Sequence, residues 1–256
     1  MPKSRTNPRR PNNVTLVQVR YESKWTVASM SAYLHVAGDL GAELAIFPEC
    51  FPFGDEENAP DIEKARDELA RINCPPSLAF IAGGYVKDDE GTRNAVFLVY
   101  EGGVRGSYFK QFRWKKEGIK SGAGCARFVW GDGNDARACV PLICADVYSP
   151  LAAQRKKLFK SAREVGAQQG DLFVVSAYAG VPHGARWRSA LFAWAEEFES
   201  PVAFCNFAGV DPNPGPTQNF GHGGSDVFWE ERRLIQPEQP GVYVHDLADF
   251  DGPDSA

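Results

Sequence analysis

The chain has 256 residues, a formal net charge of -5 at pH 7, and 43% hydrophobic and 12% aromatic residues. This length and composition are ordinary for one globular domain with a buried core. The negative charge argues against the basic face that nucleic-acid-binding proteins usually carry, so we expect no nucleic-acid partner. No hydrophobic run approaches the ~18 residues of a transmembrane helix, so we expect no membrane partner and a cytoplasmic location.

The first twelve residues are basic and interrupted by proline. No hydrophobic stretch behind them could serve as the core of a signal peptide. We therefore expect a flexible basic leader over residues 1–12, one domain over residues 13–250 and a tail over residues 251–256.

The first half of the domain predicts a β-α-β order followed by a hairpin. A strand is expected over residues 13–21, a helix over residues 25–40 and a short buried strand over residues 44–47. Another buried strand follows over residues 78–86. A hairpin is expected from residues 94–100 and 104–108, because Gly102 and Gly103 lie between two strand-like runs.

The second half continues to alternate strands with single helices. Strands are expected over residues 136–144, 171–178 and 202–207, helices over residues 150–168 and 186–199, and a late hairpin over residues 227–229 and 241–247. Residues 211–224, rich in proline and glycine, form the longest expected loop, either a binding loop or a plain connector. This alternation predicts an α/β protein with helices packed outside its sheets.

Three reactive side chains lie at or just beyond the ends of predicted strands. Glu49 follows Phe47-Pro48, Lys110 follows Tyr108-Phe109, and Cys144 precedes Ala145-Asp146. A thiol that attacks a carbonyl or nitrile carbon needs a base for its proton and a donor for the developing negative charge. Glu49, Lys110 and Cys144 are residue types that supply these functions.

These segments resemble the motifs of the nitrilase superfamily, the carbon-nitrogen hydrolases. The resemblance includes Val17-Gln18-Val19, Leu44 to Glu49, Tyr108 to Lys110, Pro141 to Asp146 and Gly223-Gly224-Ser225. Its spacing also agrees, since Lys110 follows Glu49 by 61 positions (110 − 49) and Cys144 follows Lys110 by 34 (144 − 110). The resemblance implies an α-β-β-α sandwich that pairs into a homodimer or a higher homo-oligomer.

The resemblance also implies a mechanism. Cys144 would be the nucleophile and Glu49 the general base, then acid, with Lys110 and the backbone N–H of Ala145 holding the oxyanion. Glu117, seven positions beyond Lys110, would support them. We therefore expect a hydrolase that cleaves a small non-peptide amide through a thioester, without a cofactor. The alternatives are nitrile hydrolysis, acyl transfer by the same triad, or a binding protein that keeps the fold without turnover.

The chain departs from the family beside its nucleophile. Ala145 stands where relatives usually have Tyr or Trp. Tyr148 stands where many have an Arg that meets a substrate carboxylate, which weakens the case for carboxylate-bearing amides. We expect substrate contacts from Tyr148, Trp187 and Tyr178. Arg186 or Arg188 could replace the missing Arg, although surface charge is their plainer explanation.

The other cysteines and the histidines show no metal pattern. The six cysteines lack regular spacing or a C-x-x-C pair, which predicts free thiols. Cys50, next to Glu49, is expected to be a packing residue. Four dispersed histidines make no ligand set, so no metal is expected. A papain-like pair of Cys144 with His183 or His222 stays open as a minor alternative.

Overall fold

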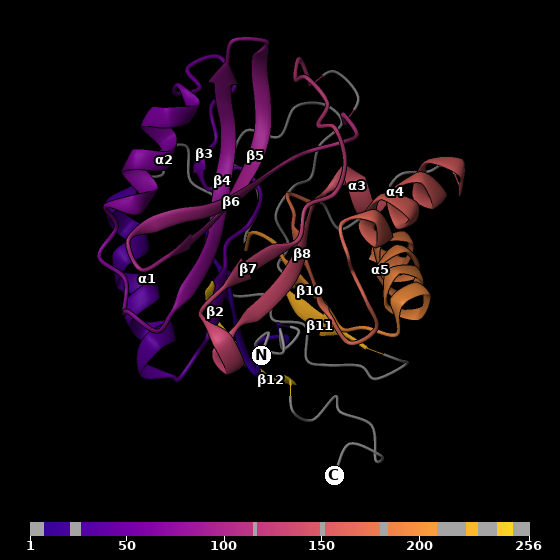
Figure 1. Cartoon of the computed structure of the whole chain (residues 1–256). Helices are drawn as coiled ribbons and strands as arrows, with labels where there is room; N and C mark the ends of the chain where they lie inside the picture. The colour runs from indigo at the N-terminus through magenta and orange to yellow at the C-terminus, as the bar shows by residue number, and fades with distance from the viewer. Residues whose placement is uncertain are drawn as a thin grey trace, which may run out of the picture.

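The computed structural model describes residues 8–20, 27–114, 117–148, 152–179, 184–208, 224–229 and 240–247. Two β-sheets lie face to face, with helices on their outer sides (Figure 1). This layering is the α-β-β-α sandwich that the sequence motifs predict.

The first sheet contains seven strands within the described residues. Its order is β12-β1-β2-β4-β5-β6, with β3 beside β4. The strands are β1 (Asn13–Gln18), β2 (Leu44–Ile46), β3 (Pro52–Phe53), β4 (Ala79–Asp88), β5 (Gly91–Tyr100), β6 (Gly103–Phe109) and β12 (Gly241–Asp246). Two helices, α1 (Val27–Asp39) and α2 (Ile62–Ala70), cover its outer face.

The second sheet contains five described strands in the order β11-β10-β9-β8-β7. They are β7 (Phe128–Trp130), β8 (Arg137–Ile143), β9 (Leu172–Ser176), β10 (Val202–Cys205) and β11 (Asp226–Phe228). The helices α4 (Ala152–Glu164) and α5 (Gly184–Phe198) lie outside it. A one-turn helix, α3 (Ala145–Tyr148), follows β8, and a 3-10 turn, η1 (Gly133–Asp135), precedes it.

Alternating side chains divide the core into two clusters, as the two-residue period of a strand requires. Val14 and Leu16 of β1 belong to the cluster that also contains residues of β8 and β9. Val17, which points the other way, belongs to the cluster with Met30 and Leu34 of α1. The first sheet is therefore buried on both faces, one against the second sheet and one against helices.

The two sheets are linked at the carboxyl ends of their parallel strands. β2 runs parallel to β1 and β4, and β8 runs parallel to β9. Beyond these ends the Ser176 hydroxyl donates to Phe47 O at 2.9 Å, and Glu49 N donates to Ala177 O at 3.3 Å. Segments that follow β2 and β9 are thereby fixed side by side. Carboxyl ends of parallel strands are also where α/β proteins commonly bind ligands.

The structure corrects one sequence prediction and qualifies another. The late hairpin is wrong: β11 pairs with β10 in the second sheet, whereas β12 pairs with β1 in the first. Part of the expected leader is bonded to the start of β8. Arg9 N donates to Ala136 O at 2.9 Å, and Ala138 N donates to Arg9 O at 2.7 Å. Residues 1–7 and most of the expected loop over residues 211–224 lie outside the described residues.

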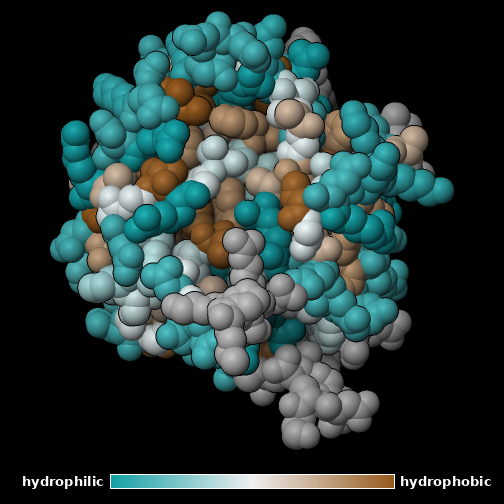
Figure 2. All heavy atoms as spheres, viewed as in Figure 1, coloured by the Kyte–Doolittle hydropathy of each residue, from teal (hydrophilic) through white to brown (hydrophobic). Residues whose placement is uncertain are grey.

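The surface is mostly hydrophilic but not uniformly so. Figure 2 shows hydrophobic residues gathered across the middle of one face, between hydrophilic margins. Among the described helices, none is long and apolar enough to cross a membrane.

The packing of Trp194 gives a test of the outer core. Its ring contacts Phe159, Phe173 and Phe198 at centroid distances of 4.7–5.8 Å, and its buried indole N–H has no hydrogen-bond partner among the described residues. We expect Trp194→Ala to cost roughly 3–5 kcal/mol of unfolding free energy. Trp194→Phe should cost less than Trp194→Ala, because it keeps an aromatic ring and removes an unpaired donor. Urea titration measures both, and equal losses would contradict the packing described.

Candidate active site

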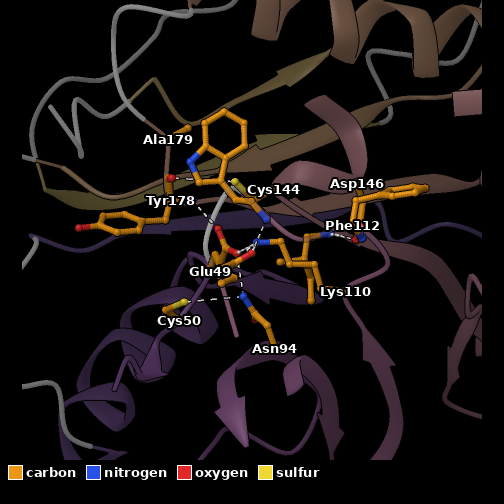
Figure 3. A network of polar contacts seen from close by, with 12 residues as sticks. Glu49, Cys50, Asn94, Lys110, Phe112, Cys144, Asp146, Tyr178 and Ala179 are labelled. Carbon is orange, nitrogen blue, oxygen red and sulfur yellow. Dashed lines mark hydrogen bonds and ion pairs between the residues drawn. The ribbon is translucent and has the colours of Figure 1, made fainter. Parts of the chain in front are cut away.

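A buried ammonium group lies between two carboxylates at the junction of the sheets. Lys110 directly follows β6, and its side chain is 1% exposed. Its Nζ lies 2.7 Å from Glu49 Oε1 and 2.9 Å from each carboxylate oxygen of Glu117. In Figure 3 the ends of Glu49 and Lys110 meet near Cys144. The structure thus brings together the four side chains that the sequence singled out.

The Glu49 carboxylate is held in place by groups from both sheets. Asn94, on β5, donates from Nδ2 to Glu49 Oε1 at 2.8 Å. The backbone N–H of Tyr178, just beyond β9, donates to Glu49 Oε2 at 3.1 Å. Because both carboxylate oxygens have donors, the orientation of the group is fixed before any ligand arrives.

The Glu117 carboxylate has its own donors besides Lys110. Trp114 N donates to Oε2 at 2.6 Å, and the Tyr85 hydroxyl donates to Oε1 at 3.2 Å. Tyr85, on β4, pairs in register with Asn94 on β5. One cross-strand pair therefore supplies a donor to each glutamate that binds Lys110.

Cys144 occupies a sharp turn between β8 and α3. Its φ of 40° is in the left-handed region that non-glycine residues seldom adopt. The turn is fixed by Cys144 N donating to Ser176 O at 3.0 Å and by Val147 N donating to Cys144 O at 3.0 Å. Strain of this kind persists only where surrounding bonds enforce it, and it is common at functional sites.

The thiol of Cys144 and the carboxylate of Glu49 share one neighbouring residue. Cys144 Sγ lies 3.9 Å from Tyr178 O, while Tyr178 N bonds Glu49. Ala145 follows Cys144 as the first residue of α3. Backbone N–H groups in a first helical turn have no acceptor within their helix, so that of Ala145 is a suitable donor for an oxyanion beside the thiol.

Asp146 joins the turn of Cys144 to the segment that follows Lys110. Its Oδ2 accepts from the Tyr108 hydroxyl at 2.7 Å and from Ile143 N at 3.1 Å. Its Oδ1 accepts from the backbone N–H groups of Gln111 and Phe112, both at 2.9 Å. Burial raises the pKa of Asp146 to about 6, although these donors oppose the shift. Asp146 is therefore the structural clamp between the two segments.

Burial and mutual charge set the protonation of the site. Burial raises the pKa of Glu49, against the lowering effect of Lys110. Burial disfavours the ammonium of Lys110, but the surrounding carboxylates outweigh it and raise its pKa well above the usual value. Burial and then the negative charge of Glu49 raise the pKa of the Cys144 thiol. Cys144 therefore rests as a neutral thiol beside a carboxylate.

The expected substrate contacts reach the site in two ways: Tyr148 and Trp187 as stacked rings, and Tyr178 through its backbone. The Tyr148 ring stacks on Trp187 with centroids 5.2 Å apart, one helical turn beyond Cys144. Tyr178 reaches Glu49 and Cys144 through its backbone, while its ring packs edge-on against Phe207 at 5.4 Å. In Figure 3 that ring points away from Lys110. Tyr178 is thus better described as a backbone contact than as a ring platform.

Of the remaining candidates, Cys50 borders the site, whereas the two arginines lie on the surface. Arg186 and Arg188 are exposed on α5. Cys50 is a buried free thiol with Sγ 3.9 Å from Asn94 Nδ2, and burial raises its pKa well above the usual value. His183 and His222 lie outside the described residues. No cluster of potential metal ligands occurs in the part of the chain that the structure describes.

Sequence reasoning missed the contribution of Tyr85 and the full contribution of Asp146. Tyr85 lies in an ordinary strand pattern, and only its register opposite Asn94 connects it to the site. The sequence places Asp146 beside Cys144 but does not reveal the four donors that its carboxylate binds. Its place after an apolar strand was a signal, since a carboxylate buried there must find donors.

The clamp gives a test of site stability. Each oxygen of Asp146 accepts from two donors, so Asp146→Asn must turn an amide NH2 toward at least one backbone N–H: that of Ile143, or those of Gln111 and Phe112. We expect a loss of roughly 2–4 kcal/mol in unfolding free energy by urea titration. Asp132→Asn at an exposed position is the matched control and should change stability by less than about 0.5 kcal/mol. A neutral Asp146→Asn would contradict the clamp.

The chain is similar in sequence to a curated amidase. No protein-family model matches the chain. A curated relative, the omega-amidase YafV of Escherichia coli, is 27% identical over 184 residues. That match covers 69% of this chain and 66% of the relative, just under two thirds of the relative's length.

Solved structures match over nearly the whole chain. Nit3 of Saccharomyces cerevisiae, a member of branch 10 of the nitrilase superfamily, has a TM-score of 0.70 at 15% identity, covering 96% of both chains. A mutant of the Nesterenkonia AN1 amidase, from the same superfamily, has a TM-score of 0.66 at 21% identity, covering 95% of this chain and 94% of that one. The chain therefore has the fold of the nitrilase superfamily, as its sequence motifs predict.

Proposed function

We propose that the protein is a carbon-nitrogen hydrolase that cleaves a small non-peptide amide through a thioester on Cys144. The observation that carries this proposal is the Lys110 ammonium held between the carboxylates of Glu49 and Glu117, with the Cys144 turn beside it. Similarity to an omega-amidase and to amidases of the superfamily supports an amide substrate.

The first step is acylation. Glu49 takes the thiol proton as Cys144 Sγ attacks the carbonyl carbon, because the raised pKa of the thiol leaves little thiolate at rest. The carbonyl oxygen becomes an oxyanion, which Lys110 and the backbone N–H of Ala145 stabilise. Glu49 then returns the proton to the leaving nitrogen. Ammonia or an amine departs as the C–N bond breaks, and the acyl group stays on sulfur.

The second step is hydrolysis of the thioester. Glu49, again a carboxylate, removes a proton from water as the water oxygen attacks the acyl carbon. The same donors hold the second oxyanion. When the C–S bond breaks, sulfur recovers the proton and the carboxylic acid leaves. Glu117 keeps Lys110 oriented throughout, since it binds the ammonium with both oxygens.

Two broader expectations stay predictions from the sequence. We propose a homodimer, or a higher homo-oligomer, and a cytoplasmic location.

Trapping the thioester tests the proposed chemistry. With a panel of small primary amides, we expect ammonia release and, on rapid acid quenching, an intact-mass increase equal to the acyl group. Cys144→Ala should abolish both, and Glu49→Gln should lower turnover at least about 100-fold. Cys74→Ala, which alters a free thiol outside the site, is the control and should keep both signals. Full turnover by Cys144→Ala would overturn the assignment.

The Tyr85 hydroxyl gives a test through the pH profile. Without it, Glu117 loses one donor, so Lys110 is drawn toward Glu117 and stabilises ionised Glu49 less. The pKa of Glu49, already raised by burial, then rises further. For Tyr85→Phe we expect the acidic limb of kcat/KM to move up by roughly 0.5–1 pH unit, since a hydrogen bond to a charged group is worth ~1.5–3 kcal/mol.

The matched control is Tyr33→Phe on α1, at the outer face of the first sheet. It should leave the profile unchanged. A Tyr85→Phe profile that falls uniformly at every pH would instead mean that Tyr85 has only a structural function.

A further inference from the structure

Three aromatic rings contact one another in series close to the Cys144 turn. The Trp114 ring meets Tyr148 edge-on at 5.7 Å, and Tyr148 stacks on Trp187 at 5.2 Å with an interplanar angle of 29°. Phe204 of β10 supports Trp187 from behind at 5.2 Å. We call Trp114, Tyr148 and Trp187 the aromatic wall.

The wall bridges the two segments that carry the reactive groups. Tyr148 N donates to Cys144 O at 3.3 Å, so Tyr148 lies one turn of chain beyond the nucleophile and is bonded to its backbone. Trp114 N donates to Glu117 Oε2, so the opposite end of the wall is fixed to the carboxylate that holds Lys110. An acyl group bound to Cys144 would therefore lie next to these rings.

The accessibility of the wall suits a ligand. Trp187, the innermost ring of the wall, is only 7% exposed. Tyr148 and Trp114 are half-buried. Partly exposed aromatic side chains close to a reactive centre can contribute to stacking with an aromatic ligand.

The charges beside the wall disfavour an anionic ligand. The single ammonium of Lys110 is bound by two carboxylates, so these three groups carry a net negative charge. Like charges brought together in a buried site repel strongly. The two carboxylates would therefore offset the attraction of Lys110 for a substrate carboxylate, and Tyr148 offers it no positive charge.

We propose that the acyl part of the substrate carries a neutral aromatic ring that stacks on the aromatic wall. The substrate class is then an arylalkyl primary amide, which the reaction converts to an arylalkyl carboxylic acid and ammonia. This inference rests on the proposed amide hydrolysis and adds the identity of the acyl group.

The test compares three amides on the purified full chain: 3-phenylpropionamide, butyramide and succinamate. We expect kcat/KM for the phenyl compound to exceed that for butyramide by roughly 10- to 100-fold, the usual range for apolar pocket contacts. Succinamate should be the poorest of the three. Equal or better rates with butyramide or succinamate would overturn the inference.

Variants of the wall separate ring stacking from general damage. Tyr148→Leu should reduce the preference for the phenyl amide to a few-fold, while Tyr148→Phe should retain it. Tyr148→Arg should raise activity on succinamate relative to the phenyl amide. Tyr100→Leu, at the far end of β5 from Asn94, is the matched control and should leave the preference unchanged. An unchanged preference in Tyr148→Leu would contradict the assignment of the wall.

The same experiment distinguishes failure of this inference from failure of the proposed function. If no amide releases ammonia and Cys144 gains no acyl mass, the hydrolase proposal itself is wrong and this inference falls with it. If amides are cleaved without preference for the aromatic ring, only the inference is wrong.

Discussion

The rest of the site depends on the burial of the Lys110 ammonium. Removing such a charge from water costs several kcal/mol unless close partners replace the lost solvation. Here Glu49 and Glu117 replace it, but two carboxylates around one cation need further donors of their own. Those donors come from β4, β5, the segment after β9 and the loop before Glu117. Moving any of these elements would deprive a buried carboxylate of one of its donors, so the arrangement of the sheets and the site support each other.

A second constraint is the strained turn at Cys144. Its left-handed backbone is held by Ser176 from the neighbouring strand and by the four donors of Asp146. Two of those donors belong to Gln111 and Phe112, directly beyond Lys110. The segment with the thiol and the segment with the ammonium are therefore fixed relative to each other by one buried carboxylate. A preorganised site of this kind needs little rearrangement when charge develops.

Much of this organisation could be predicted from the sequence, because strand ends leave local signals. Glu49 and Cys144 each follow an apolar run, Lys110 follows Tyr108-Phe109 at a strand end, and their order and spacing resemble a known family pattern. The residues that hold the site carboxylates in place left no such signal. Tyr85 is one residue in a regular strand, and its bond to Glu117 depends on long-range register. The late hairpin was wrong for a similar reason: two nearby strands resemble a hairpin locally, while their pairing with β10 and β1 is decided by the sheets.

The charge balance at Lys110 links mechanism to selectivity. Burial and then the negative charge of Glu49 raise the pKa of the Cys144 thiol, so in the proposed mechanism its attack is coupled to proton transfer to Glu49. The excess of negative charge around Lys110 also penalises an anionic acyl group close to the thiol. Among the described residues beside the Cys144 turn, the half-buried rings of Trp114 and Tyr148 offer uncharged surface, which is where we propose that selectivity arises. On the proposed mechanism, a change at Tyr148 would therefore alter which acyl group is accepted without disturbing the proton transfers at Glu49.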